Sequence, residues 1–352
     1  MNINKGRKGG TMKHHTDLEA LQPLDVDNCE NLMEILDSMA QTSFGGRNTG
    51  RAWSVLKGVV DDPDCALVLT LSGAVTVAKL GRVVGSMISK GVVDAVITTG
   101  AIVTHSLVEE LGMQHYKAPP ALSDDDLYKR SLNRVYDSIE PESNLEALED
   151  FVRGAFSNLA SDKAYGSFEL IRHVSSKIPA CDRSKGFLAA AYTHNVNVYV
   201  PALSDSELGL YLFRYTRYHK SPDATNITHD PLLDLSEYAR WMFSRKRMAF
   251  LTLGGGVPRN WGQQMLPFLK SQDKWGGLPD GANLPKIVAA IRICPDSAEL
   301  GHLSGSTYSE GITWGKFEPS SKENLVEVHC DATILFPILA KSLLDYIAQG
   351  KK

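Results

Sequence analysis

Six short apolar runs, separated by longer segments with helical spacing, constrain the fold of this chain more than any other feature. Each run is rich in Val, Ile or Leu and is too short for an ordinary helix, so each predicts a strand. The runs are Ala66–Leu71, Val92–Thr98, Asn197–Val200, Met248–Leu253, Lys286–Ile293 and Leu325–His329. Strands that are apolar on both faces and alternate with helices indicate a parallel sheet that is covered on both sides. The pattern therefore predicts a doubly wound α/β fold with a mostly parallel sheet.

Helical spacing is clearest over Leu145–Leu159, Ser206–Tyr218 and Pro231–Arg247. The last of these has Asp230 as its N-cap and Pro231 at the first helical position. Residues 1–16 are basic and glycine-containing, which predicts a flexible arm, and 17–352 is expected to form a single domain.

Composition excludes several classes of protein. With 43% apolar and 22% charged residues, the chain can bury a sizeable core. The net charge of −4 gives no overall attraction to phosphate backbones or anionic lipids, and no apolar run is long enough to span a bilayer. The five cysteines form no C-x-x-C pair. We therefore expect a cytoplasmic protein with reduced thiols, without a metal site, and without nucleic-acid or membrane partners.

Small and hydroxyl-bearing residues follow several of the predicted strands. In open α/β sheets ligands bind at the carboxyl ends of the strands, and small residues there let the backbone approach a phosphate. The segments concerned are Ser72-Gly73-Ala74, Thr98-Thr99-Gly100-Ala101, Pro201-Ala202-Leu203-Ser204-Asp205, Gly254-Gly255-Gly256 and Cys294-Pro295-Asp296. They favour a nucleotide, although any one of them could simply form a tight turn. The common G-x-G-x-x-G fingerprint is absent, since Arg259 stands where its third glycine belongs.

The glycine-rich stretch Leu300–Phe317 places Glu310, Trp314 and Lys316 within seven residues of one another. A lysine beside an indole can lie over the ring, or lose water so that its amine becomes a nucleophile for imine formation. The alternative is a solvated surface lysine beside a tryptophan that packs against the fold.

Here the sequence resembles the deoxyhypusine synthases. Ser304-Gly305, Glu310 and Thr313-Trp314-Gly315-Lys316 precede Cys330-Asp331-Ala332-Thr333-Ile334-Leu335-Phe336-Pro337, and these segments are similar to the family's S/T-W-G-K and A-D-A-S-x-x-F-P motifs. Further matching pieces are Phe44–Arg51, Thr98-Thr99-Gly100-Ala101, Pro201-Ala202-Leu203-Ser204-Asp205 and Leu253-Gly254-Gly255-Gly256-Val257. They occur in the family's order along nearly the whole chain.

The resemblance implies a Rossmann-like sheet, NAD as cofactor, and a homotetramer that shares its sites between paired subunits. It implies transfer of a 4-aminobutyl group from spermidine or putrescine to an amine through an imine on Lys316, with Glu310 and Trp314 holding the polyamine. The residue-by-residue match also implies a set of NAD contacts: Gly73, Ala74, Val75, Thr76, Val77, Thr99, Gly100, Ala101, Asp205, Pro295, Asp296, Asp331 and Ala332.

The chain departs from the family in its polyamine pocket. The enzymes that modify the translation factor 5A precursor carry a glutamate pair where this chain has Thr104 and His105, and a histidine where it has Asn260. Leucines replace further acidic residues of that pocket, namely Leu210, Leu300 and Leu303. Thr104, His105 and Asn260 are therefore candidate contacts for a different amine, although a lone histidine is often structural.

These departures favour a homospermidine synthase-like enzyme whose acceptor is a small polyamine. A true deoxyhypusine synthase, acting on a lysine of the translation factor 5A precursor, is the alternative. A catalytically idle NAD-binding subunit that regulates an active relative is a third reading, which the retention of Lys316 disfavours.

Overall fold

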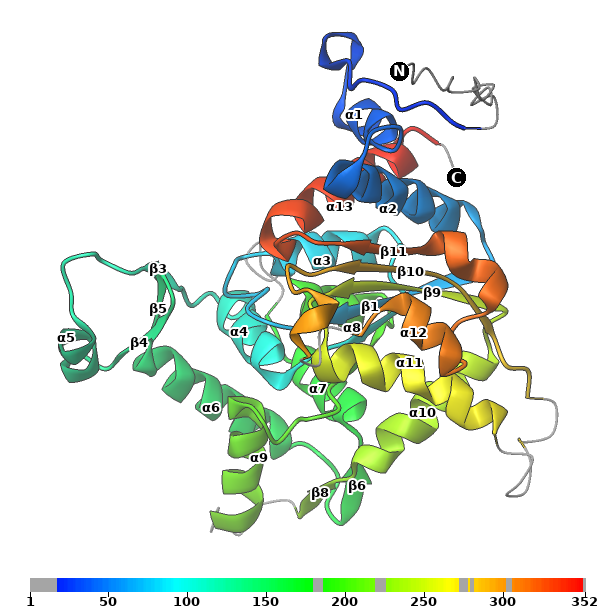
Figure 1. Cartoon of the computed structure of the whole chain (residues 1–352). Coiled ribbons are helices and arrows are strands. Elements are labelled where there is room, and N and C mark those ends of the chain that lie inside the picture. The colour runs from blue at the N-terminus through cyan, green and yellow to red at the C-terminus, as the bar shows by residue number, and fades with distance from the viewer. Residues whose placement is uncertain are drawn as a thin grey trace, which may run out of the picture.

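The computed structural model of the chain describes residues 18–179, 186–218, 226–271, 278, 282–301 and 306–350. Residues 1–16 and Leu303 lie outside this part, so the flexible arm and the role of that leucine stay predictions. The described residues build a central sheet with helices on both faces and a smaller side lobe (Figure 1).

The central sheet contains the strands that the apolar runs predict. They are β1 (Cys65–Leu71), β2 (Ala95–Ile97), β7 (Asn197–Tyr199), β9 (Arg247–Leu253), β10 (Lys286–Ile293) and β11 (Leu325–Val328). Every neighbouring pair in this sheet is parallel, and the spatial order is β11-β10-β9-β1-β2-β7. Counted along the chain this is the 3-2-1-4-5-6 order of a Rossmann fold, in which the order reverses between β1 and β9. The predicted fold class is confirmed.

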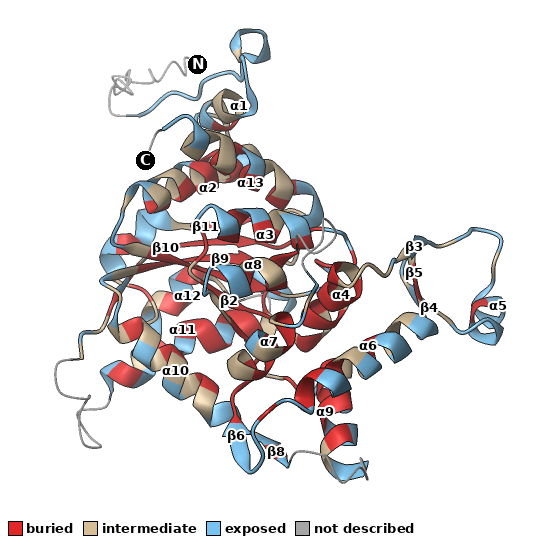
Figure 2. Ribbon diagram, turned by 180° about the vertical axis from the view of Figure 1, so that it is seen from behind, coloured by how far each residue is buried: buried red, intermediate tan, exposed pale blue. Residues whose placement is uncertain are grey.

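Alternate residues of the same strand enter different hydrophobic clusters, because side chains of a strand alternate between its faces. Leu67 and Leu69 of β1 join the cluster with Trp53 and Val84, whereas Val68 joins the cluster with Tyr238. Figure 2 shows the buried strands between the two helical layers. Both faces of the sheet are therefore covered, as the continuous apolar runs predict.

Helices form the two layers, and α2, α3 and α13 lie on the side of the sheet opposite α10, α11 and α12 (Figure 1). The helices are α1 (Leu32–Met39), α2 (Phe44–Asp61), α3 (Gly81–Ser89), α4 (Gly100–Glu110), α5 (Asp124–Lys129), α6 (Glu142–Phe156), α7 (Ser167–Ser175), α8 (Phe187–Thr193), α9 (Glu207–Tyr218), α10 (Pro231–Phe243), α11 (Gly256–Lys270), α12 (Tyr308–Thr313) and α13 (Ala332–Ala348).

The helix boundaries expected from the sequence differ from the observed ones by a few residues, although the helices themselves are present. The Asp230 carboxylate accepts from Leu232 N–H, which confirms the predicted N-cap, but α10 ends at Phe243 because Arg247 already begins β9. The helix predicted over Leu145–Leu159 occupies Glu142–Phe156 instead.

Two small sheets have no counterpart in the apolar pattern of the sequence. One pairs β6 (Lys163–Tyr165) with β8 (Ile227–His229). The other contains β3 (Tyr116–Lys117), β4 (Leu132–Val135) and β5 (Ser138–Pro141), and with α5 it forms the side lobe, residues 114–141, seen at the left of Figure 1. Strands of two to four residues are too short to produce a readable apolar pattern.

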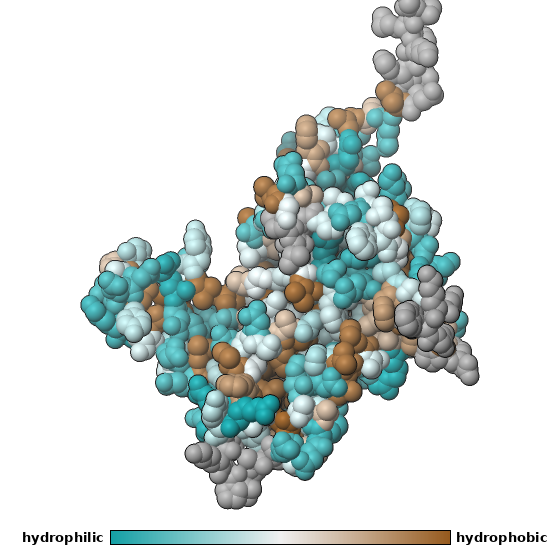
Figure 3. Space-filling model, turned by 60° about the horizontal axis from the view of Figure 1, so that its bottom comes forward, coloured by the Kyte–Doolittle hydropathy of each residue, from teal (hydrophilic) through white to brown (hydrophobic). Residues whose placement is uncertain are grey.

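Apolar surface interrupts the hydrophilic face at the bottom of the molecule (Figure 3). Exposed apolar side chains include Leu210 and Phe213 of α9 and Phe268 of α11. Within the described residues, no helix combines the length and the apolar character that crossing a bilayer demands.

Candidate active site

A cavity of about 220 Å³ opens at the carboxyl edge of the central sheet, where the strand order reverses. We call it the switch-point cavity. It is lined by Ser72, Thr98, Thr99, Ala202, Asp205, Gly255, Gly256, Val257 and Pro258. These residues follow β1, β2, β7 and β9, so the predicted meeting of several strand exits is confirmed. This is the position at which doubly wound sheets bind nucleotides.

The switch-point cavity fits a nucleotide cofactor in two respects. The Thr98 hydroxyl is buried and has no hydrogen-bond partner among the described residues. In addition, α4 and α11 both begin here, and neither N-cap residue, Thr99 or Gly255, bonds to the first N–H groups through its side chain. Within the described residues, the N–H groups at these two helix starts thus lack a capping side chain and can bind a phosphate. The Asp205 carboxylate is exposed at the cavity and can accept hydrogen bonds from ribose hydroxyls.

The other predicted cofactor positions lie at the same edge of the sheet but do not line this cavity. Gly73 and Ala74 are exposed after β1, whereas Val75, Thr76 and Val77 are buried. The Thr76 hydroxyl donates to the Ile102 carbonyl (3.0 Å). Side chains of these three residues therefore face the fold, and only their backbone can approach a ligand.

The remaining positions follow other strands or begin helices. Pro295 is exposed after β10, and Asp296 accepts a weak hydrogen bond from the Cys294 thiol (3.4 Å). Asp331 caps α13, where its carboxylate accepts from Thr333 N–H (2.7 Å). Gly100 and Ala101 open α4, and Ala332 opens α13.

The Trp-Gly-Lys motif forms the C-terminal end of α12. Gly315 has φ of +69°, its N–H donates to the Ile312 carbonyl, and Lys316 N–H donates to the Gly311 carbonyl. This pair of bonds is the Schellman motif, which glycine favours because the left-handed conformation costs it nothing. The turn reverses the chain after Trp314, so that Lys316 returns toward the body of the fold.

Gly311 and Phe317 anchor this turn. A Cβ atom on Gly311 would lie 2.7 Å from the Phe317 ring. Phe317 is buried and meets Tyr308 edge-on, with ring centroids 5.2 Å apart. Because the neighbour of Lys316 is held in the core, the lysine backbone has a fixed position.

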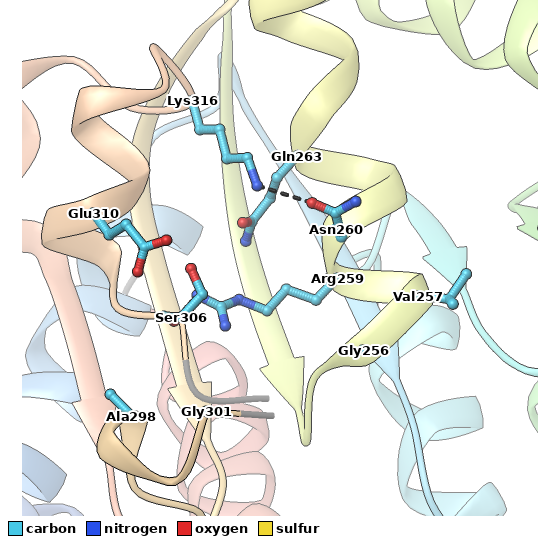
Figure 4. A pocket seen from close by; sticks show the side chains of 10 residues that line it. All are labelled: Gly256, Val257, Arg259, Asn260, Gln263, Ala298, Gly301, Ser306, Glu310 and Lys316. Carbon is cyan, nitrogen blue, oxygen red and sulfur yellow. Dashed lines mark hydrogen bonds between the residues drawn. The ribbon is translucent and has the colours of Figure 1, made fainter. Parts of the chain in front are cut away.

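Lys316 lines a second cavity of about 440 Å³, the Lys316 cavity, which shares Gly256 and Val257 with the switch-point cavity. Its Nζ donates to the Asn260 side-chain oxygen (2.9 Å), and the Asn260 amide nitrogen donates to Gln264 (2.9 Å). Figure 4 shows Lys316 and Asn260 pointing toward one another, with Glu310 on the α12 side. The structure thus brings together three of the predicted site residues.

Burial lowers the pKa of the Lys316 amine below its usual value, and the nearby positive charge of Arg259 lowers it further, while the Glu310 carboxylate acts in the opposite direction. Asn260 is neutral and offers the ammonium only a hydrogen bond. A lysine with a lowered pKa holds a larger fraction of neutral, nucleophilic amine near pH 7.

Sequence reasoning missed Arg259 and Gln263, two buried residues of α11 that line the Lys316 cavity. Arg259 Nη2 donates to the Ser306 carbonyl (2.6 Å), and its guanidinium lies 5.1 Å from the centre of the Tyr308 ring. Arg259 Nε and Gln263 Nε2 have no partner among the described residues. The only sequence signal for Arg259 as a site residue is its position shortly after the triple glycine.

Three predicted substrate residues lie outside the Lys316 cavity. Trp314 is 67% exposed and lines neither cavity. Thr104 is fully buried, and its hydroxyl donates to the Gly100 carbonyl within α4 (3.1 Å). His105 packs instead beside His115 and Glu140. Their substrate roles stay predictions, because none of the three lines the Lys316 cavity within one chain.

Glu140 is buried at the centre of this second group. Its burial acts to raise its pKa, but hydrogen bonds from His105, His115 and Asn144 outweigh that effect and lower the pKa to about 2. The carboxylate is therefore ionised throughout the physiological range.

Comparison with known proteins identifies the family. A sequence profile described as deoxyhypusine synthase matches residues 34–343. The chain belongs to the deoxyhypusine synthase family. This family consists of NAD-dependent transferases, so the cofactor expected from the resemblance is confirmed, and the switch-point cavity is the part of the fold that fits it.

Curated relatives agree with the assignment over most of the chain. A probable deoxyhypusine synthase 1 from Archaeoglobus fulgidus is 32% identical over 89% of this chain and 93% of its own length. A probable deoxyhypusine synthase from Methanothermobacter thermautotrophicus is 30% identical over 92% of this chain and 97% of its own. Among solved structures, a putative deoxyhypusine synthase from Entamoeba histolytica matches with a TM-score of 0.58 and 14% identity. It covers 92% of this chain and 96% of its own, which supports the fold.

Proposed function

We propose that this protein transfers a 4-aminobutyl group from spermidine to a lysine of the translation factor 5A precursor, through an imine on Lys316. The observation that carries the proposal is the lowered pKa of Lys316 in a cavity adjoining one that fits NAD. The sequence alone favoured a small polyamine as acceptor. The names of the relatives support the protein lysine instead, so the order of the two readings is reversed.

NAD, when bound, supplies the oxidation of the donor amine to an imine and the final reduction. The neutral Lys316 amine attacks the imine carbon of the donor; a C–N bond to Lys316 forms, the C–N bond to diaminopropane breaks, and the aminobutyl group remains on Lys316 as an imine. The acceptor amine then displaces Lys316 in the same way. This step regenerates the free amine of Lys316, and diaminopropane is the only group that leaves.

Two neighbours of Lys316 suit these steps. Asn260 fixes the direction of Nζ through the 2.9 Å hydrogen bond, which keeps the amine at one place in the cavity. Glu310 supplies the carboxylate that a cationic amine end requires.

A small diamine as acceptor is the second candidate, and the charge of the cavity favours it. Among the described residues that line the Lys316 cavity, Glu310 is the only carboxylate, whereas Lys316 and Arg259 are both basic. A cavity with so few carboxylates departs from the polyamine pocket expected of the family, which supports a change of substrate. The idle regulatory subunit gains no support, since an amine with a lowered pKa is a feature of a working nucleophile.

The homotetramer expected from the resemblance forms part of the proposal. Exposed Trp314 and the apolar side chains of α9 support an assembly in which a second subunit covers them. Light scattering at micromolar concentration should report four chains, and a monomer would remove the shared-site arrangement.

The acceptor is tested by offering both candidates to the same enzyme. The protein is incubated with NAD and spermidine, together with either the translation factor 5A precursor or putrescine, and products are identified by mass. Deoxyhypusine in the precursor supports the leading proposal, whereas homospermidine alone would support the second. If diaminopropane is not released with either acceptor, the protein is not a transferase of this kind.

A further inference from the structure

Three metal-ligating side chains converge outside the Lys316 cavity. His105 Nδ1 lies 3.1 Å from His115 Nε2 and 3.3 Å from Glu140 Oε2, and His115 Nε2 also contacts Glu140 Oε2. All three ligand atoms lie within 4.8 Å of one another. We call these three residues the His-Glu cluster.

The fold builds the cluster from the main body and the side lobe. Tyr116 pairs with Ile139 and Lys117 with Ser138 in antiparallel register, so the next position places His115 opposite Glu140. His105 comes from the second turn of α4. The side chains of His115 and Glu140 are each 2% exposed, and that of His105 is 16% exposed.

Asn144 holds the carboxylate in the orientation that a ligand needs. Its amide nitrogen donates to Glu140 Oε1 (2.6 Å), which leaves Oε2 facing the two imidazoles. Hydrogen bonds of this kind, behind the ligating atoms, orient the ligands of established metal sites.

We propose that His105 Nδ1, His115 Nε2 and Glu140 Oε2 bind one divalent transition-metal ion, with zinc as the probe. Ligand atoms bound to one such ion at about 2.0–2.2 Å lie roughly 3.0–3.5 Å apart, and both distances from His105 fall in that range. Two imidazoles and a carboxylate suit zinc, iron or manganese rather than calcium or magnesium. The more exposed His105 side leaves a coordination position open to water.

Such an ion would connect α4 to the side lobe. Of its ligands, His105 belongs to the main body, whereas His115 and Glu140 belong to residues 114–141. Because the three ligands come together only in the folded chain, metal binding would stabilise the junction by mass action.

Lys79 competes with the ion in this arrangement. Its Nζ contacts His115 Nδ1 at 2.9 Å. When Nε2 binds a metal, Nδ1 of a neutral imidazole carries the proton and cannot accept from an ammonium. Lys79 must then turn away, and Glu109 Oε2, 4.0 Å from Nζ, is the carboxylate within its reach. Replacing Lys79 with methionine should tighten zinc binding by roughly tenfold, since a like charge at this range shifts ionic equilibria by about one unit or more.

The experiment measures zinc per chain after treatment with a chelator and dialysis against zinc. The protein carries no added histidine tag, and all variants carry His14→Ser and His15→Ser, because adjacent histidines can bind zinc by themselves. We expect one ion per chain in this background, a loss of at least tenfold in affinity in His105→Ala and Glu140→Gln, and tighter binding in Lys79→Met. His194→Ala, which removes an exposed histidine outside the cluster, is the matched control and should bind as the background does.

Melting curves with and without zinc provide the second readout. Zinc should raise the melting temperature of the background protein and leave that of His105→Ala unchanged. His105 has the most exposed side chain of the three ligands, so its truncation is the mildest test of the fold. A background protein that binds no zinc, or a His105→Ala variant that binds it as well as the background, would overturn the proposal.

Discussion

The Lys316 cavity and the His-Glu cluster have opposite effects on the charged side chain that each contains. In the cavity, the ammonium of Lys316 has a neutral amide as its hydrogen-bond partner and the guanidinium of Arg259 nearby, so its charged form is disfavoured. In the cluster, the Glu140 carboxylate receives hydrogen bonds from three side chains and its charged form is favoured. The first arrangement disfavours the ammonium form of Lys316, as the proposed imine chemistry requires, and the second holds an anion in a fixed place, as the proposed metal site requires.

Glu110 is a second buried carboxylate, and its environment can be compared with those of Glu140 and Lys316. Like Glu140 it is 1% exposed, but its partners are neutral: the Ser106 hydroxyl and the N–H groups of Leu188 and Ala189. Burial raises its pKa to about 7 despite these bonds. The two carboxylates thus differ in charge because burial prevails at Glu110, whereas the hydrogen bonds from side chains prevail at Glu140.

The largest effect is expected for Lys316→Arg. Arginine keeps the positive charge but stays protonated, so it cannot form an imine. Transfer should fall by at least about a thousandfold, as is usual for loss of a covalent nucleophile. Product formation measures the loss, and thermal stabilisation by NAD should be unchanged. A variant that transfers at the wild-type rate would show Lys316 to be an ordinary surface lysine.

The pH dependence of the free energy of unfolding is expected to reveal the raised pKa of Glu110. Its pKa is higher in the folded than in the unfolded chain, so the native state binds more protons between pH 4.5 and 7 and loses stability as the pH rises through this window. Relative to wild type, the free energy of unfolding of Glu110→Gln should rise by about 3 kcal/mol across this pH window, because each unit of pKa difference corresponds to about 1.4 kcal/mol. Urea unfolding at pH 5 and pH 7 provides the measurement. A constant difference between the two proteins at both pH values would contradict this assignment.

Gly311→Ala tests the anchor of the Lys316 turn. The added methyl group would lie 2.7 Å from the Phe317 ring, and such crowding costs about 1–3 kcal/mol. We expect that loss in the free energy of unfolding, together with weaker transfer, because Phe317 adjoins the nucleophile. Gly58→Ala is the matched control: a Cβ there meets no atom within 4 Å, so the change should be neutral or stabilising.

The smallest effect on stability is expected for Trp314→Ala. An exposed side chain that packs against little should change the free energy of unfolding by less than about 0.5 kcal/mol. If a second subunit completes the site, transfer should nevertheless fall substantially. Unchanged transfer would remove Trp314 from the substrate site and weaken the shared-site arrangement.

The sequence predicted the central sheet well because each strand is a continuous apolar run, and both faces of the sheet bury such runs. It also placed Lys316, Glu310 and Asn260 in one site, since they lie in motifs of a recognisable family. It could not predict the His-Glu cluster. His105, His115 and Glu140 have no regular spacing, and a pairing of two-residue β3 with β5 brings them together.

The charge states of the buried groups could not be predicted from the sequence either. Whether Glu110 or Glu140 is ionised depends on donors from other elements, such as the N–H groups of α8, which no local pattern reveals. Burial of Arg259 beside Lys316 is likewise a property of the packed fold.

Whether the Lys316 amine carries the aminobutyl group can be decided by trapping the imine. Borohydride added during turnover with NAD and spermidine reduces an imine to a stable amine, and peptide mass analysis locates the adduct. We expect an aminobutyl mass on the peptide that contains Lys316, and none in Lys316→Arg. An adduct on another lysine, or product formed without any adduct on Lys316 under trapping conditions, would contradict it.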